Sequence, residues 1–294
     1  MALAFLGPRG TFSEEAALGY LEREGEQPDL IAFPSIPALT AAVETGLADR
    51  SILPIENSVD GSVSSTLDLL IHETSLKIRG EIVLPVRQFL VTVPGVQLSD
   101  IQVVTSHPQG LGQCRRFIER CLPNAQQVAA LSTAGAVEEV AKSGDTTRAA
   151  IGPARAAELY GGSVLAHDIQ DNRANVTRFV VLAKEDAPPT GADKTSFAFT
   201  VKENVAGALH AVLSVLAVKG IQMTKIESRP TKAWLGAYVF MVDIDGHRSD
   251  PVVAESLATI KEMSGVFQVF GSYPRFPLEI FAELFSAPGF PVSG

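Results

Sequence analysis

The stretch Lys184 to Lys194, KEDAPPTGADK, divides the chain into two parts. Its charged, Pro and Gly residues separate an apolar strand at Arg178 to Ala183 from an alternating strand at Ser196 to Val201. A chain of 294 residues is long for one domain and comfortable for two, since domains commonly hold about 100 to 200 residues. We therefore predict a first domain over residues 1–184, a linker over 185–194, a second domain over 195–274 and a tail over 275–294.

Before the linker, short β-like runs alternate with helical runs. The β-like runs are Leu3 to Leu6, Leu30 to Phe33, Arg50 to Pro54, Glu81 to Val93, Ile101 to Thr105, Gln127 to Ala130 and Ala149 to Ile151, and helices start near Ser13, Ile36, His107 and Thr133. This alternation predicts an α/β domain with mostly parallel sheets. Ligands of such domains bind at the carboxyl ends of strands, so the motifs that follow strands matter most.

After the linker, the predicted order is strand, helix, strand, strand, helix, strand. The elements span residues 195–202, 204–219, 221–229, 235–244, 251–264 and 266–273. In the first helix the apolar residues from Val205 to Leu216 form one stripe, and Gly220 supplies the stop. This βαββαβ order predicts a ferredoxin-like unit, and we expect the Pro-containing tail to be partly ordered and packed on one domain.

Composition excludes several classes of function. The net charge of −9 argues against nucleic-acid binding, and the five histidines form no metal-ligand spacing, so we expect no metal or cofactor. Cys114 and Cys121 also lack such a spacing, and we expect them to be reduced packing residues. No apolar run has membrane-spanning length, and the N-terminus reaches a Gly-Pro turn too soon for a signal peptide. We therefore expect a cytoplasmic protein without membrane contact.

Two motifs in the first part of the chain follow strands. GPRGTFS, at residues 7–13, opens a helix that we expect Ser13 to cap, and its amides and hydroxyls could hold a carboxylate. PIENSVDG, at residues 54–61, places a carboxylate, an amide and a hydroxyl in one turn, which suits the binding of hydroxyl groups. The alternatives are an ordinary strand-to-helix turn for the first motif and side chains that only satisfy loop backbone for the second.

Three later motifs also carry polar groups. Ser106 precedes a helix that we expect it to cap, and Gln113 lies on the same helix face, so both could point into one cleft. Ser132 and Thr133 precede a helix of small residues whose amides a ligand could approach. Thr177 and Arg178 enter the last strand before the linker, a placement that suits a carboxylate clamp beside a hydroxyl donor. Each has a structural alternative: simple helix caps for the serines and a surface ion pair for Arg178.

As an ordered set, these segments resemble the prephenate dehydratase family. The set is GPRGTFS, PIENSVDG, SHPQGLGQC, STAGA, IGPARAAELYG and NVTRF, across roughly residues 3 to 183. The resemblance implies a fold like a type II periplasmic binding protein, with two α/β lobes and an active site in the cleft between them. It implies the decarboxylating dehydration of prephenate to phenylpyruvate in phenylalanine biosynthesis, without a cofactor.

The resemblance also assigns roles to residues. It implies that Thr177 is the essential hydroxyl, that Asn57, Ser106 and Gln113 are further active-site groups, and that Glu56 is their neighbour. It implies that Arg178 binds a substrate carboxylate, and we expect the remaining substrate contacts from Phe179, Thr11, Ser132 and Thr133. The chain departs from the family at Gly110, Gly162, Arg173 and Ala174, which affects loop geometry more than chemistry.

The second domain resembles an ACT regulatory domain. The matching motifs are Gly207-Ala208-Leu209 at a helix start and Glu227-Ser228-Arg229-Pro230 at a strand end. They imply allosteric binding of L-phenylalanine and a homodimer or homotetramer, whereas the alternative is a domain that only dimerises. The first motif begins at Gly7, so we expect no chorismate mutase domain before it. Two rival functions stay open at this point, an arogenate dehydratase and a pure amino-acid receptor.

Overall fold

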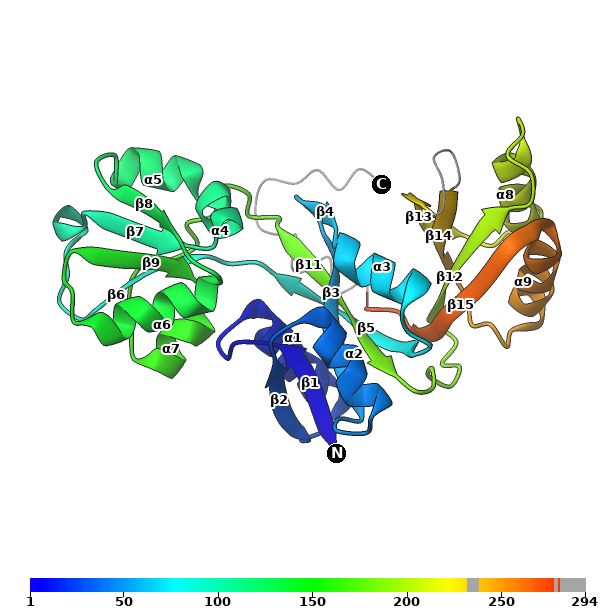
Figure 1. Ribbon diagram of the computed structural model, residues 1–294, viewed down its shortest axis with the longest axis horizontal. Helices are drawn as coiled ribbons and strands as arrows, with labels where there is room; N and C mark the ends of the chain where they lie inside the picture. Colours follow the sequence, from blue (N-terminus) through cyan, green and yellow to red (C-terminus); the bar gives the residue numbers. More distant parts are fainter. Residues whose placement is uncertain (232–237, 278–279, 281–294) are drawn as a thin grey trace.

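The computed structural model describes residues 1–231, 238–277 and 280, which form three sheets flanked by helices (Figure 1). The strand orders are β2-β1-β3-β11-β5, with β4 paired to β3, then β10-β6-β9-β7-β8, and β13-β14-β12-β15. Figure 1 shows the first sheet in the middle of the molecule, with the second and third sheets at its two sides. No helix in this described part of the chain is long and apolar enough to cross a membrane.

Lobe 1 contains the first sheet. Its elements are β1 (Ala2–Leu6), α1 (Phe12–Glu24), β2 (Asp29–Phe33), α2 (Ile36–Glu44), β3 (Arg50–Asn57), β4 (Gly61–Ser62), α3 (Ser64–His72), β5 (Lys77–Pro85) and β11 (Val176–Ala183). β1 pairs in parallel with β2 and β3, whereas β11 lies antiparallel between β3 and β5. This register sets Thr177 of β11 opposite Asn57 of β3.

Lobe 2 contains the second sheet and joins lobe 1 through two crossing segments. These are residues 86–88, between β5 and β6, and residues 167–175, between β10 and β11. Its elements are β6 (Phe89–Thr92), the 3-10 helix η1 (Leu98–Asp100), β7 (Val103–Ser106), α4 (Pro108–Gln113), α5 (Arg115–Cys121), β8 (Gln126–Ala129), α6 (Thr133–Ser143), β9 (Arg148–Gly152), α7 (Ala154–Tyr160) and β10 (Ser163–Ala166). The predicted run Glu81 to Val93 is therefore two strands, β5 and β6, in different lobes. Between them Val86 donates its amide to Asn175 O, at 2.8 Å, so the two crossing segments bond to each other.

The third domain, which is the second domain of the sequence prediction, has the expected βαββαβ order and an antiparallel sheet. Its elements are β12 (Asp193–Val201), α8 (Ala208–Val218), β13 (Met223–Pro230), β14 (Tyr238–Asp245), α9 (Pro251–Met263) and β15 (Ser264–Pro274). β12 starts at Asp193, inside the predicted linker. Helix α8 starts later than predicted because Gly207, at φ 87°, interrupts the helical backbone. Residues 235–237 of the predicted third strand and most of the predicted tail lie outside the described residues.

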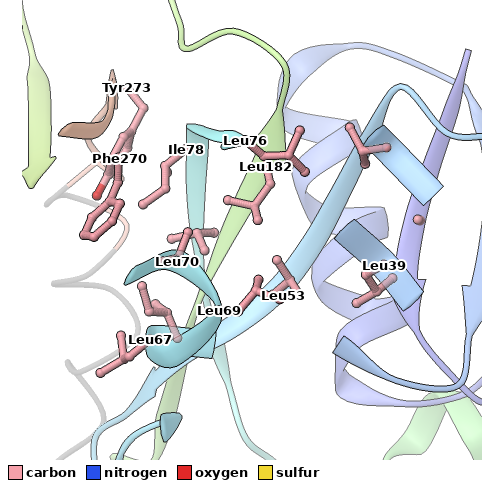
Figure 2. Close-up of a cluster of buried hydrophobic side chains, with 14 of the residues drawn as sticks. Leu39, Leu53, Leu67, Leu69, Leu70, Leu76, Ile78, Leu182, Phe270 and Tyr273 are labelled. Carbon is pink, nitrogen blue, oxygen red and sulfur yellow. The ribbon is translucent and has the colours of Figure 1, made fainter. Parts of the chain in front are cut away.

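Lobe 1 and the third domain share one hydrophobic core (Figure 2). Phe270 and Tyr273 of β15 lie beside Ile78 of β5 and are almost completely buried. Between them, a Cβ on Gly271 would stand 2.3 Å from Ile78 O, so only glycine allows β15 to approach β5 this closely. The third domain is thus packed into lobe 1 rather than suspended from a linker.

The two cysteines are free in the structure. Cys114 is fully buried, and burial raises the pKa of its thiol to about 12. A thiol with this pKa stays protonated at neutral pH, as a packing residue does.

Candidate active site

A cavity of about 470 Å³ lies between lobes 1 and 2. Its walls come from strand ends and helix starts of both lobes, and they are Leu6, Gly7, Thr11, Phe12, Ser13, Pro34, Pro54, Asn57, Val63, Val86, Gln88, His107, Gln109, Gly110, Gln113, Leu131, Ser132, Thr133, Thr177 and Phe179. Seven predicted site residues are in this set: Thr11, Asn57, Gln113, Ser132, Thr133, Thr177 and Phe179. We call this cavity the cleft.

Thr177 and Asn57 are hydrogen-bonded on adjacent strands. The Asn57 amide Nδ2 donates to Thr177 Oγ1 at 2.9 Å and to Asn175 Oδ1 at 2.7 Å. Asn57 Oδ1 accepts the amides of Val59 and Asp60, both at 2.9 Å, so the Asn57 side chain is fixed at both ends. Because Thr177 accepts from Asn57, its own hydroxyl proton is directed away from Asn57 and can be donated to a ligand.

Asp60 connects the two lobes across the cleft. It lies in the turn between β3 and β4, and its Oδ2 accepts from Gln109 Nε2 at 2.5 Å and from Gln113 Nε2 at 3.0 Å. Gln113 Oε1 in turn accepts from Gln88 Nε2 at 3.2 Å, on the crossing segment. These bonds orient the Gln113 amide and hold lobe 2 against lobe 1.

Helix N-termini supply the positive potential in the cleft. Thr11 caps α1 by accepting from the Glu14 amide at 3.4 Å, and Ser132 caps α6 by accepting from the Gly135 amide at 2.9 Å. Neither lysine nor arginine is among the described residues that line the cleft. The amides of the first turns, together with the helix dipoles, are therefore the groups that can attract an anion there.

The expected caps at Ser13 and Ser106 are wrong. Ser13 lies inside the first turn of α1, two residues beyond Thr11, which holds the cap position from which a hydroxyl reaches the N3 amide. His107 caps α4 instead of Ser106, because Pro108 occupies the first helical position. Ser106 is fully buried and donates to Ile151 O at 2.6 Å, so it stands beneath α4 rather than among the cleft residues.

Glu56 and Arg178 lie on the other side of the sheet. Side chains of a strand alternate between its faces, so Arg178 points away from the cleft that Thr177 lines. Its Nη1 lies 2.8 Å from Asp243 Oδ2 of the third domain, and its Nε lies 3.4 Å from Glu56 Oε2. The structure does not bring Arg178 or Glu56 into the cleft, contrary to the expectation that Arg178 contacts the substrate.

Comparisons with known proteins identify the family. The family model for prephenate dehydratase matches residues 3–187. A prephenate dehydratase of Mycolicibacterium vanbaalenii is 40% identical over 286 residues, which cover 92% of this chain and 90% of that protein. The chain belongs to the prephenate dehydratase family. As a member of this family it converts prephenate to phenylpyruvate with loss of water and carbon dioxide.

Solved structures agree with the fold. A prephenate dehydratase of Arthrobacter aurescens, in complex with L-Phe, is 38% identical with a TM-score of 0.85, over 94% of this chain and 90% of that chain. GqqA, described as a novel type of quorum quenching acylases, is 31% identical with a TM-score of 0.83, over 95% and 100% of the two chains. The two-lobed fold with a ferredoxin-like third domain is thus confirmed for this member of the prephenate dehydratase family. Since GqqA has a different described activity, the assignment of roles depends on the side chains of the cleft.

The two motifs predicted to bind the effector lie on different elements of this prephenate dehydratase homologue. Gly207 to Leu209 begin α8, and Glu227 to Pro230 end the edge strand β13. Ser228 and Pro230 are exposed, whereas Glu227 accepts from the Ser62 hydroxyl and Arg229 bonds Asp68 Oδ1 at 3.0 Å in lobe 1. Among the described residues no hydrogen bond or ion pair joins the two motifs.

Sequence reasoning missed four polar residues in or beside the prephenate dehydratase cleft as functional groups. They are Asp60, Gln88, Gln109 and Asn175. Asp60 and Gln109 lie inside the quoted motifs, at turn and helix-start positions, so the sequence could have predicted that they lie near the site. Asn175 begins the recognised motif NVTRF, whereas Gln88 lies outside every motif; both stand in the crossing segments, whose proximity depends on tertiary structure.

Proposed function

We propose that the prephenate dehydratase reaction takes place in the cleft and that Thr177 donates its hydroxyl proton to the ring hydroxyl that leaves. The observation that carries the proposal is the bond from Asn57 Nδ2 to Thr177 Oγ1, at 2.9 Å. In this bond Thr177 accepts from Asn57, which leaves its own hydroxyl proton available for donation into the cavity. Gln113, oriented by Asp60 and Gln88, supplies a second donor amide near the same space.

The reaction needs orientation and charge stabilisation more than it needs a strong acid. The bond between the ring carbon and its carboxylate breaks, and its electron pair makes the ring aromatic while the C–O bond to the hydroxyl breaks. The departing oxygen takes the Thr177 proton and leaves as water, and the Thr177 oxygen regains a proton from water. Because threonine is a weak acid, Thr177 polarises the departing hydroxyl within the Asn57 and Gln113 network rather than transferring its proton early.

We propose that helix N-termini, rather than Arg178, bind the two carboxylates of prephenate. The first turn of α1 at Phe12 and Ser13 and the first turn of α6 at Thr133 face the cleft and begin helices of 13 and 11 residues. Amides of these turns and the helix dipoles favour anions locally although the net charge of −9 opposes them at long range. Phe179 offers an apolar surface for the ring.

A product assay tests the function. The purified protein is incubated with prephenate and, separately, with arogenate, and phenylpyruvate and phenylalanine are measured separately. We expect phenylpyruvate from prephenate. Phenylalanine formed only from arogenate would make the protein an arogenate dehydratase, and binding of prephenate without turnover would make it a receptor.

We also propose that L-phenylalanine regulates the enzyme through the third domain. Support comes from the Arthrobacter aurescens relative, which was solved with L-Phe, and from the exposed Ser228 and Pro230 beside the lobe-facing Glu227 and Arg229. A ligand on the outer side of β13 would sit on a strand whose other side contacts lobe 1. Inhibition requires that the ligand prefer one conformational state, with a coupling of about 1 to 3 kcal/mol.

Substitution of Ser228 tests this regulation. We expect Ser228→Ala to weaken inhibition by phenylalanine and to leave the uninhibited rate nearly intact. Ser214→Ala is the matched control, because Ser214 lies on α8 and donates only to His210 O within its own helix. Equal inhibition of the Ser228→Ala variant and the native protein would remove β13 from the proposed site.

We propose a homodimer or homotetramer formed through third domains. Val205, Val218 and Val266 of the third domain are 61%, 84% and 62% exposed, and a second copy could cover such apolar side chains. Sedimentation at several protein concentrations gives the assembly state, and a monomer at all concentrations would contradict the proposal.

A further inference from the structure

Six charged side chains form a cluster behind β11, the strand that carries Thr177, between lobe 1 and the third domain. They line a cavity of about 500 Å³, which lies on the face of β11 opposite the cleft, and they are Glu56, Glu81, Arg178, Lys194, Lys225 and Asp243. Arg275 lines the same cavity, so four cations face three anions there, and Arg275 Nη1 also lies 3.6 Å from Asp245 Oδ2. Because the side chains of Glu81, Asp243 and Arg178 are only 1%, 8% and 12% exposed, loss of one charge would leave a partner without compensation in a shielded site.

Asp243 is the contribution of the third domain to this cluster. It lies on the central strand β14, where its Oδ2 accepts from Arg178 Nη1 at 2.8 Å and its Oδ1 accepts from Ser196 at 2.6 Å. Burial raises the pKa of Asp243, but Arg178, Ser196 and Lys194 together outweigh burial and hold the pKa below its ordinary value. Asp243 therefore stays ionised at neutral pH.

Glu81 holds the same arginine from lobe 1. Its carboxylate accepts from Arg178 Nη1 at 3.3 Å, from Lys194 Nζ at 2.8 Å and from the Phe276 amide at 2.9 Å. Glu81 belongs to β5, which pairs with β11 on one side. Arg178 is thus held between a strand of its own sheet and a strand of the third domain.

The backbone beside Arg178 is irregular. Arg178 pairs with Glu56 of β3, whereas the next residue, Phe179, pairs with Pro54, so Ile55 is an extra residue in β3. Such a bulge bends a strand and redirects its side chains. The end of β11 that carries Thr177 is therefore separated from the regular part of the β3 pairing, and the Arg178 side chain is an additional anchor at this point.

We propose that Arg178 and Asp243 are positioning residues, whose buried ion pair lets the third domain hold the end of β11 that lies beside the β3 bulge and so place the Thr177 hydroxyl in the cleft. The inference rests on the role proposed above for Thr177. It makes the third domain a part of the catalytic geometry and not only a site for an effector. A shift of β14 would reach Thr177 through two side chains, those of Asp243 and Arg178, and one peptide unit.

The test compares Asp243→Asn with Lys77→Met in the full chain. Asp243→Asn keeps the shape and removes the charge. Lys77 Nζ donates to Val269 O at 2.8 Å across the same interface, but Lys77 lies opposite Ala183, at the other end of β11 from Thr177. Rates with prephenate are measured together with the ¹³C-methyl NMR signal of Thr177, which is identified by its loss in Thr177→Ser.

We expect Asp243→Asn to lower kcat about tenfold, with KM changed by less than about twofold, and to shift the Thr177 methyl signal. Lys77→Met should change neither. An Asp243→Asn variant with native kcat and a native Thr177 signal would overturn the proposal, and so would equal losses in both variants, because loosening of the interface would then explain them.

Two further outcomes are also decisive. If Asp243→Asn does not fold, Arg178→Lys keeps the charge and loses the forked geometry, and it should show the same loss of kcat and the same NMR shift. Native behaviour of Arg178→Lys would then reject the proposal. If the native protein does not convert prephenate, the proposed function fails, and the Thr177 signal in the Asp243→Asn variant alone decides whether the third domain positions β11.

Discussion

Glu15 makes the stability of the protein depend on pH near neutrality. It lies in the first turn of α1, and burial raises the pKa of its carboxyl from 4.5 to about 7, an increase that Arg155 of α7 only partly opposes. The start of α1 packs closely on lobe 2 here, since a Cβ on Gly10 would stand 2.9 Å from Ala156 Cα. A carboxyl at the contact between the lobes is thus neutral at mildly acidic pH and ionised above pH 7.

The sign follows from proton linkage. In the folded state Glu15 binds its proton more tightly than in the unfolded state, so the free energy of unfolding falls as pH rises from about 4.5 to about 7 and is level above it. Each pKa unit corresponds to about 1.4 kcal/mol, so the full change is about 3 kcal/mol at most. Glu15→Gln removes this dependence.

Urea unfolding of both proteins between about pH 5 and pH 8 measures the effect. We expect the stability of Glu15→Gln relative to the native protein to rise through this window and then to level off. Because the difference cancels all other titrating groups, a difference that is independent of pH would refute the reasoning about Glu15.

Three other predictions concern the lobe contact and the shared core. Asp60→Ala should raise KM for prephenate about tenfold, because the lobe-bridging bonds to Gln109 and Gln113 are charge-assisted. The thermal midpoint should change little, since Asp60 is exposed. An unchanged KM would argue against lobe closure through Asp60. Phe270→Ala should lower the free energy of unfolding by about 3 to 5 kcal/mol in urea titrations. A chain that ends at Asp186 should lose cooperative unfolding because it uncovers Ile78; a cooperative, active fragment would contradict the shared core.

The elements and most of the cleft could be predicted because they depend on local sequence. Strand runs, helix starts and the motifs that follow strands correctly predict that Asn57, Ser132 and Thr177 lie near the ligand site. Helix caps need one more local rule, which explains the error at Ser106: a proline at the first helical position makes the residue just before it the cap.

The position of Arg178 could not be predicted in full. Strand periodicity alone implies that Thr177 and Arg178 point to opposite faces. It does not reveal that the third domain covers the second face with Asp243, because that contact joins residues 65 positions apart. The close packing of Gly271 on Ile78, which fixes this cover, is likewise a property of tertiary structure.

The most direct test of the account is the comparison of Thr177→Val with Thr177→Ser in prephenate turnover and prephenate binding. Thr177→Val removes the donor and one of the two acceptors of the Asn57 amide, whose bond to Asn175 remains, whereas Thr177→Ser keeps the hydroxyl. We predict that Thr177→Val lowers kcat at least about 100-fold, with Kd for prephenate by calorimetry changed by less than about threefold, and that Thr177→Ser retains most of the activity. A Thr177→Val enzyme with near-native kcat would contradict the account, because the proton donor would then lie elsewhere.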